Sequence, residues 1–222
     1  MNKIVAEKRY LSGKLGVDYS SLSQSFLRAE TQLTTTSVIP FEFQSSQVTT
    51  SIVTEKLLEL NDEFALTQVG VFLKQISADS PTDLQHLNSQ LLTWNDPQTF
   101  TGTNAANVGA IYNADLSFTI NRTQFIPAID TRDFRRVPNT QQNNNALASG
   151  TATTPADTFS PIGTDEVNLA YSFLDVDPTL IDGRQTLDIN INLGSSVTFD
   201  DASNFYAAVA ILRGYLITNA KS

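Results

Sequence analysis

Hydrophobic and polar residues alternate without a break in the stretch QTLDININLG, residues 185–194. The apolar set is Leu187, Ile189, Ile191 and Leu193, and the polar set is Asp188, Asn190 and Asn192. Successive side chains of an extended strand point to opposite faces, so the pattern predicts a strand over 185–193 with one apolar and one polar face. The apolar face belongs in a core. The polar face meets water, a ligand or another copy of the chain.

Other strands are predicted where apolar residues alternate or fill both faces. Residues 64–77 are apolar on both faces and change parity near Gln68, which predicts a central strand with a bulge around Gly70. The closing stretch 204–218 is apolar on both faces except at Arg213, so it also reads as a buried central strand. Further strands are expected over 114–120 and 166–174, and DTRDFRRVP, 130–138, suggests a short charged strand or edge piece.

Two segments show the three-to-four-residue spacing of a helix face. The first is 18–31, with Asp18 placed to cap its first turn. The second is 81–93, with Ser80 as cap and Pro81 in the first turn. Its apolar stripe is Leu84, Leu87 and Leu91. We expect this second helix to lie across one end of the sheets, inside a long crossover connection.

These elements predict an all-β fold, because strands dominate and do not alternate with helices. The long irregular connections favour an antiparallel β-sandwich of the jelly-roll type, with a short N-terminal helix and one crossover helix. We expect an N-terminal arm over 1–17 and a single sandwich domain over 18–222. A long polar loop is expected over 138–162, since large apolar residues are almost absent there.

Charge divides the chain into a basic head and an acidic body. Residues 1–28 contain five basic and two acidic residues, a balance of +3, whereas the whole 222-residue chain carries −9. The basic residues of the expected arm are Lys3, Lys8, Arg9 and Lys14. One interpretation is a solvated tail, and the other is an arm that makes a weak contact with nucleic acid or an acidic partner.

The amino-acid composition excludes several kinds of functional site. The chain has no cysteine and one histidine, so thiolate sites and histidine clusters are excluded, and we expect neither a cofactor nor enzymatic activity. His86 lies on the predicted helix and has no GxSxG elbow to support it, so we expect a partly exposed helix residue. No apolar run has the length of a signal peptide or a membrane span, so neither is expected.

Two weaker patterns suggest ligand sites. The stretch DVDPTLIDG, 175–183, offers Asp175, Asp177 and Asp182 to a cation, but it departs from the EF-hand pattern and favours a plain turn. The aromatic residues Trp94, Phe100 and Tyr112 suggest a sugar-binding platform, with core packing as the simpler interpretation.

The runs EKLLELNDEFALTQVGVFLKQ, 55–75, and AAVAILRGYLIT, 207–218, together with the expected strand order, resemble coat proteins of small bacteriophages with jelly-roll capsids. The resemblance is architectural and implies a structural, self-assembling virion protein, built in the host cytoplasm, whose partners are its own copies and other virion proteins. Asp188, Asn190 and Asn192 would then face a neighbouring subunit. The alternative is a receptor- or carbohydrate-binding β-module of a virion spike or tail.

Overall fold

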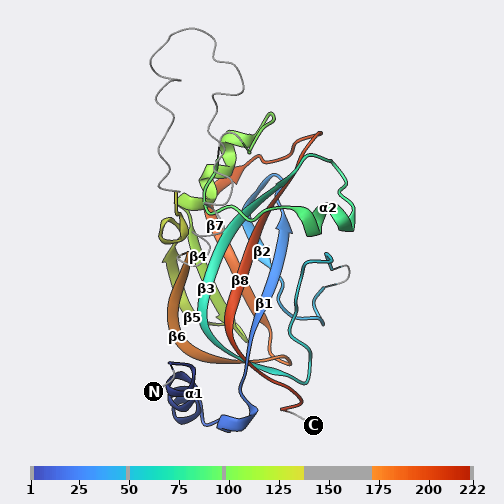
Figure 1. Cartoon of the computed structure of the whole chain (residues 1–222). Helices are drawn as coiled ribbons and strands as arrows, with labels where there is room; N and C mark the ends of the chain where they lie inside the picture. Colours follow the sequence, from blue (N-terminus) through green and yellow to red (C-terminus); the bar gives the residue numbers. More distant parts are fainter. Residues whose placement is uncertain (1–2, 49–50, 97–98, 138–171, 221–222) are drawn as a thin grey trace.

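The computed structural model describes residues 3–48, 51–96, 99–137 and 172–220, and it shows two antiparallel sheets packed face to face (Figure 1). Each sheet has four strands. The expected all-β antiparallel sandwich is therefore confirmed. The loop expected over 138–162 and most of the strand expected over 166–174 lie outside the described residues.

The two sheets take their strands from both halves of the chain. Sheet A has the order β1-β8-β3-β6, and sheet B has the order β2-β7-β4-β5. In sheet A the strands are β1 Ser23–Gln32, β8 Phe205–Ile217, β3 Glu63–Ile76 and β6 Phe173–Asp182. In sheet B they are β2 Thr36–Phe41, β7 Leu187–Val197, β4 Asp115–Ile120 and β5 Thr123–Asp130.

The strand pairs are nested around one hairpin. Strands β4 and β5 join at Asn121 and Arg122, whose positive φ angles of 48° and 68° fit a two-residue hairpin turn. Around this hairpin, β3 pairs with β6, β2 with β7, and β1 with β8, all antiparallel. Successive pairs alternate between the two sheets, so the chain runs as a long antiparallel ribbon wound across both layers.

The main core fills the space between the sheets. Strand β7 contributes Leu187, Ile189 and Ile191, each at most 1% exposed, as the alternation in QTLDININLG predicted. The irregular helix η2, Ala105–Asn113, closes one end of this core with Val108, Ile111 and Tyr112.

The outer face of sheet A is also largely covered. Helix α1, Lys3–Leu15, packs on one end through Leu11, which contacts Leu22, Ala65 and Tyr215. The other end is covered by the segment around Ile52 and by helix α2, Asp83–Asn88. This cover explains why β3 and β8 are apolar on both faces, as the sequence suggested.

The expected N-terminal helix is present, but the range predicted for it is wrong. Helix α1 occupies most of the supposed arm, and 18–31 forms a short 3₁₀ turn, Tyr19–Ser21, followed by β1. Asp18 does cap this turn, since its side chain accepts from the Ser20 amide. The rest of the segment is extended, with Leu27 and Ala29 in the main core.

Three smaller predictions need adjustment. The register shift of β3 lies between Leu66 and Gln68, so the bulge is at Thr67 and not around Gly70. The segment expected as a charged strand contains the 3₁₀ turn η3, Thr131–Phe134, which Asp130 caps. The crossover helix is shorter than 81–93 and begins after Thr82, which forms a capping box with Gln85.

Candidate functional site

The predicted interface residues lie together on the outer face of sheet B. Asp188 is exposed, Asn190 and Asn192 are half-buried, and all three point away from the core. The Asn192 amide donates to Ser117 Oγ at 3.1 Å, which fixes its side chain on the surface. Strand β7 therefore presents amide and carboxylate groups in a regular row.

Neighbouring strands extend this polar row. On β4, Thr119, Ser117 and Asp115 stand opposite Asp188, Asn190 and Asn192. On β2, Val38 and Pro40 stand opposite Asn192 and Asn190, and Val38 is 40% exposed. Within the described part of the chain, no helix packs on this face. Ser117 is buried, and the other described residues of this face form a mostly uncharged surface that can exchange hydrogen bonds with a partner.

The edges of both sheets resist strand addition. Strand β2 contains Pro40, β5 contains Pro127, and β6 contains Pro178, and a proline interrupts the ladder that an added strand needs. The fourth edge, β1, is partly occupied, because the Arg28 and Lys56 backbones exchange hydrogen bonds of 2.9 Å. An association of this protein is therefore favoured through a face and not through an edge.

A buried ionic cluster holds α2 against sheet A. The Lys74 side chain on β3 is fully buried, and its Nζ lies 2.8 Å from Glu30 Oε2 and 3.1 Å from His86 Nδ1. A charged lysine has only donors, so Nδ1 accepts and the neutral ring carries its proton on Nε2. Arg28 and Thr54 also donate to Glu30 Oε1.

The electrostatics of this cluster follow from burial and pairing. Burial would raise the pKa of Glu30, but hydrogen bonds from Lys74 and Thr54 and the charge of Arg28 hold that pKa below its usual value. Burial, and then the charge of Lys74, lower the pKa of His86. The cluster therefore favours an ionised Glu30 beside a neutral imidazole.

The prediction that His86 is a partly exposed helix residue is wrong. His86 is 7% exposed and packs edge-on against the Phe205 ring at 5.2 Å, whereas Leu84 and Leu87 are 66% and 57% exposed. Helix α2 thus turns its histidine inward and its leucines outward. This orientation gives the buried ammonium of Lys74 a second acceptor besides Glu30.

The acidic candidates for a cation site are spread along β6, so the plain turn expected over 175–183 is wrong for most of that stretch. Asp175 accepts from the Gln68 amide at 2.7 Å, and Asp177 pairs with Lys14 at 3.4 Å. Asp182 ends the strand, and the turn follows at Gly183. Among the described residues, no three acidic or histidine side chains come together as metal ligands.

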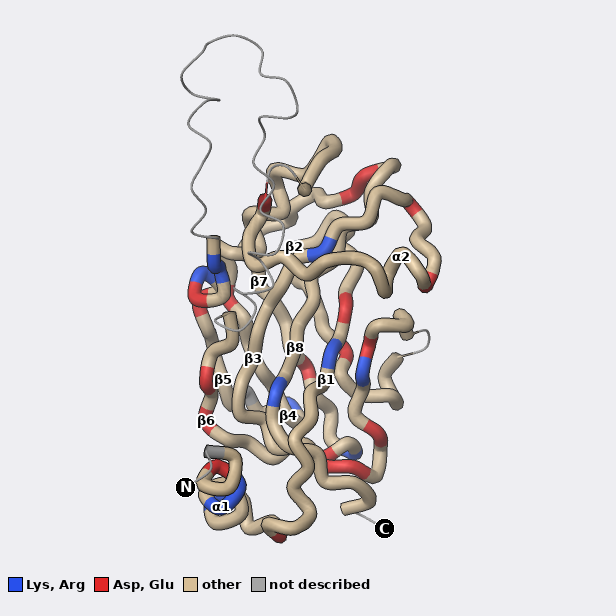
Figure 2. Tube along the Cα trace, viewed as in Figure 1, with Lys and Arg blue, Asp and Glu red and all other residues tan. Residues whose placement is uncertain are grey.

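The basic residues expected on an arm belong to the docked helix α1. Lys8 lies near the Tyr19 and Tyr215 rings, at 5.6 and 6.0 Å from their centroids, and Lys14 pairs with Asp177. Lys3 begins the helix and Arg9 lies on its exposed surface. Figure 2 shows the basic positions on α1 and acidic positions on the neighbouring strand β6.

The three residues of the expected aromatic platform differ in how deeply they are buried. Phe100 and Tyr112 are 4% and 1% exposed, so both belong to the core, and only Trp94 is half-buried. The simpler interpretation, core packing, fits Phe100 and Tyr112. The residues that sequence reasoning missed are Glu30 and Lys74. The only signal for Lys74 was a charge within the apolar strand β3, and the mostly polar sequence of β1 gave no signal for Glu30.

Comparisons with protein-family models, curated proteins and solved structures gave no significant match. None of the described helices is long and apolar enough to cross a membrane.

Proposed function

We propose that the protein is a structural subunit that assembles with its own copies into a closed shell, as capsid proteins of small bacteriophages do. The nested strand order carries the proposal. We interpret the antiparallel pairs β1–β8, β2–β7, β3–β6 and β4–β5, which alternate between the two sheets, as a jelly roll, an architecture used by viral capsids and lectins. Fold alone does not define function, so further support for the proposal must come from the residues on the surface.

The surface supports assembly through sheet B. The prolines on β2, β5 and β6 disfavour edge pairing, while Asp188, Asn190 and Asn192 offer an open hydrogen-bonding face. Such a face stays soluble before assembly and pairs amides afterwards. The partners in this proposal are other copies and other virion proteins, the assembly takes place in the host cytoplasm, and the role is structural and not enzymatic.

Particle formation tests this proposal directly. The purified chain is concentrated and followed by light scattering and negative-stain microscopy, and uniform particles or rings are expected. The variant Asn190→Asp places a second carboxylate beside Asp188 and should weaken assembly without lowering the unfolding temperature. Gln90→Glu adds the same charge at an exposed position after α2 and serves as the control. A chain that stays monomeric at every concentration refutes the proposal.

The second candidate is a receptor- or carbohydrate-binding module of a virion spike or tail. Its original support, the aromatic trio around Trp94, is lost because Phe100 and Tyr112 are buried. A groove on the outer face of sheet A, lined by Arg213 and Phe26, favours this second candidate. In that case the chain stays small in solution and binds a ligand on the face opposite to the proposed assembly surface.

A further inference from the structure

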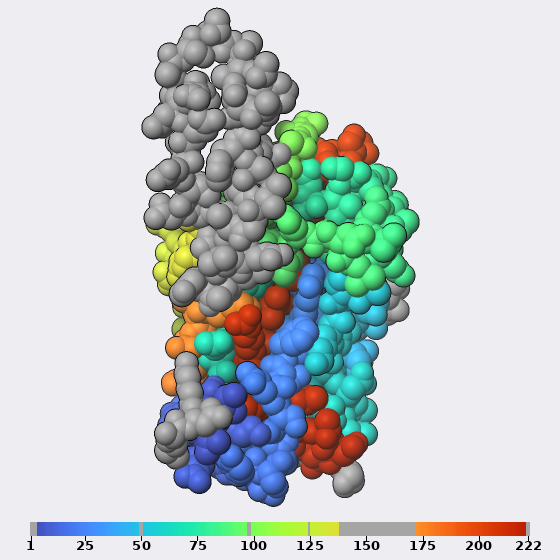
Figure 3. All heavy atoms as spheres, viewed as in Figure 1, coloured from blue at the N-terminus to red at the C-terminus, as the bar shows by residue number. Residues whose placement is uncertain are grey.

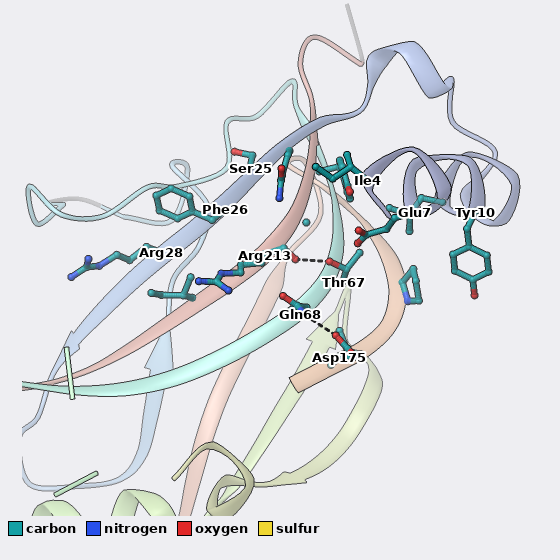
Figure 4. Close-up of a pocket in the computed structure, with 17 residues that line it drawn as sticks. Ile4, Glu7, Tyr10, Ser25, Phe26, Arg28, Thr67, Gln68, Asp175 and Arg213 are labelled. Atoms are coloured by element: carbon teal, nitrogen blue, oxygen red, sulfur yellow. Dashed lines mark hydrogen bonds between the residues drawn. The ribbon is translucent and has the colours of Figure 1, made fainter. Parts of the chain in front are cut away.

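A groove crosses the outer face of sheet A where neither α1 nor the segment around Ile52 covers the strands. It has a volume of about 970 Å³, near the upper end of small-molecule sites. Its floor comes from β1, β8, β3 and β6, and α1 forms one wall (Figure 4). Figure 3 views this face directly, with α1 in dark blue beside β1 and β8.

Arg213 stands at the centre of the groove. Its guanidinium stacks on the Phe173 ring, with 3.5 Å between Cζ and the ring centroid. Among the described residues, no carboxylate lies within ion-pair distance of it, although the other arginine of the groove, Arg28, is paired with Glu30. A stacked guanidinium is held in one orientation, and its N–H donors remain available to an oxyanion.

The strand geometry fixes this arginine. At the β3 bulge, the Thr67 hydroxyl donates to the Arg213 carbonyl at 3.2 Å. The next residue, Gly214, lies so close to β3 that a Cβ there would stand 1.9 Å from the Ala65 carbonyl oxygen. The β3 and β8 backbones are therefore pressed together beside Arg213, which fixes the position of its Cα atom, and the stacking on Phe173 orients the guanidinium.

Hydrogen-bonding groups and an aromatic ring surround the guanidinium. Gln68 and Asp175 lie on one side, where the Gln68 amide donates to Asp175 Oδ1 at 2.7 Å, and each side chain retains an oxygen that can accept a hydrogen bond. Glu7 on α1 adds another carboxylate to the wall. On the other side, Phe26 stands opposite Arg213 in the β1–β8 register and is 43% exposed.

We propose that this groove binds an acidic sugar, a pyranose with one carboxylate of the hexuronic or sialic acid type. Arg213 takes the carboxylate, Asp175 and Gln68 accept from the ring hydroxyls, and Phe26 packs against the apolar C–H face of the ring. Each of these contacts matches one chemical feature of such a sugar. The site lies on the opposite face from the assembly surface, and it gives the second candidate function a location without requiring assembly.

A nucleic acid fits the same groove less well. Its phosphates would run past the carboxylates of Glu7 and Asp175, and the protein as a whole carries a charge of −9. A sugar with a single carboxylate needs only one cation and uses the acidic side chains as acceptors. A tight, salt-sensitive complex with an oligonucleotide is therefore an outcome that overturns the proposal.

Ligand-observed NMR and calorimetry on the full chain test the site. The probes are methyl β-glucuronide and N-acetylneuraminic acid. Methyl β-glucoside, which lacks the carboxylate of the glucuronide, is the neutral control sugar. An eight-residue oligothymidylate and a glutamate-rich peptide serve as other anions. Binding of at least one acidic sugar, with the neutral sugar at least about tenfold weaker, is expected from the loss of one charge-assisted contact. Equal binding of the neutral sugar, or preference for the oligonucleotide or the peptide, overturns the proposal.

Two variants with matched controls locate the binding. Arg213→Gln should weaken the acidic sugar about tenfold or more, whereas Arg135→Gln, at an exposed arginine outside this groove, should not. If Arg213→Gln does not fold, Phe26→Thr is the second test, with Val38→Thr on sheet B as its control. Unchanged affinity in the folded groove variants refutes the site. Particle formation is measured separately, so failure of either proposal leaves the other standing.

Discussion

The variant Lys74→Met measures how strongly the buried ionic cluster supports the fold. The substitution keeps most of the side-chain volume but removes the ammonium that donates to Glu30 at 2.8 Å. Both side chains of this pair are fully buried. Glu30 then keeps Arg28 and Thr54 as donors but loses its fully buried charged partner. Removing one partner of a buried pair costs about 3 to 5 kcal/mol.

This cost translates into a large change in the unfolding temperature. For a domain of this size, about 1 kcal/mol shifts that temperature by roughly 2 to 4 °C, so a decrease of roughly 6 to 20 °C is expected at pH 7. The control is Lys14→Met, which removes the exposed pair with Asp177 and should cost no more than about 1 kcal/mol. Thermal and urea unfolding, followed by circular dichroism, supply both values.

The double variant Glu30→Met with Lys74→Met separates the penalty of an unpaired charge from the value of the pair. Replacing both ions with apolar side chains is often neutral or stabilising, so the double variant should recover most of the stability that Lys74→Met loses. A Lys74→Met variant no less stable than Lys14→Met would show that the cluster is not a buried, paired unit. A double variant less stable than both single variants would contradict the argument as well.

Two more predictions concern pH and the faces of sheet B. Because burial and the charge of Lys74 lower the pKa of His86 in the folded state, the unfolded chain takes up a proton first, and stability should decline as the pH falls below about 6.5. His86→Gln should remove this decline, and an unchanged decline would contradict the assignment. Loss from Glu30 begins only below about pH 4.5. Ile191→Asp should abolish folding because Ile191 is fully buried. Asn190→Asp should leave the unfolding temperature unchanged. An equal loss of stability from both variants would show that the two faces of β7 are assigned the wrong way round.

Strands β7 and β8 were predictable because their apolar residues face a packed core, on one side of β7 and on both sides of β8. The alternation from Leu187 to Leu193 and the apolar run of β8 each gave the correct element within a few residues. Segment 18–31 was misread because Tyr19, Leu22 and Phe26 fit a helical spacing by coincidence. There the pairing of β1 with β8, a contact far apart in sequence, decides the structure.

The position of α1 and the orientation of α2 were not predicted from the sequence. The apolar spacing of Ile4, Leu11 and Leu15 in α1 was a helix signal that went unused, and the residue that docks the helix, Leu11, is fully buried. The orientation of α2 could not be read from its own sequence, since a leucine stripe normally turns inward. In the structure, this orientation brings His86 to the buried Lys74 of β3, a contact between residues of different elements.

The two faces of the sandwich are used differently, and this division can be tested. Among the described residues, α1, α2 and the segment around Ile52 cover much of sheet A and leave the groove at Arg213, whereas no described helix packs over Asn190 on sheet B. These positions lie in different sheets, too far apart to share neighbours, so their effects should be additive. Arg213→Gln should change sugar binding but not particle formation, and Asn190→Asp the reverse. A variant that alters both properties while remaining folded would show that the faces are coupled, and the separate roles inferred for them would fail.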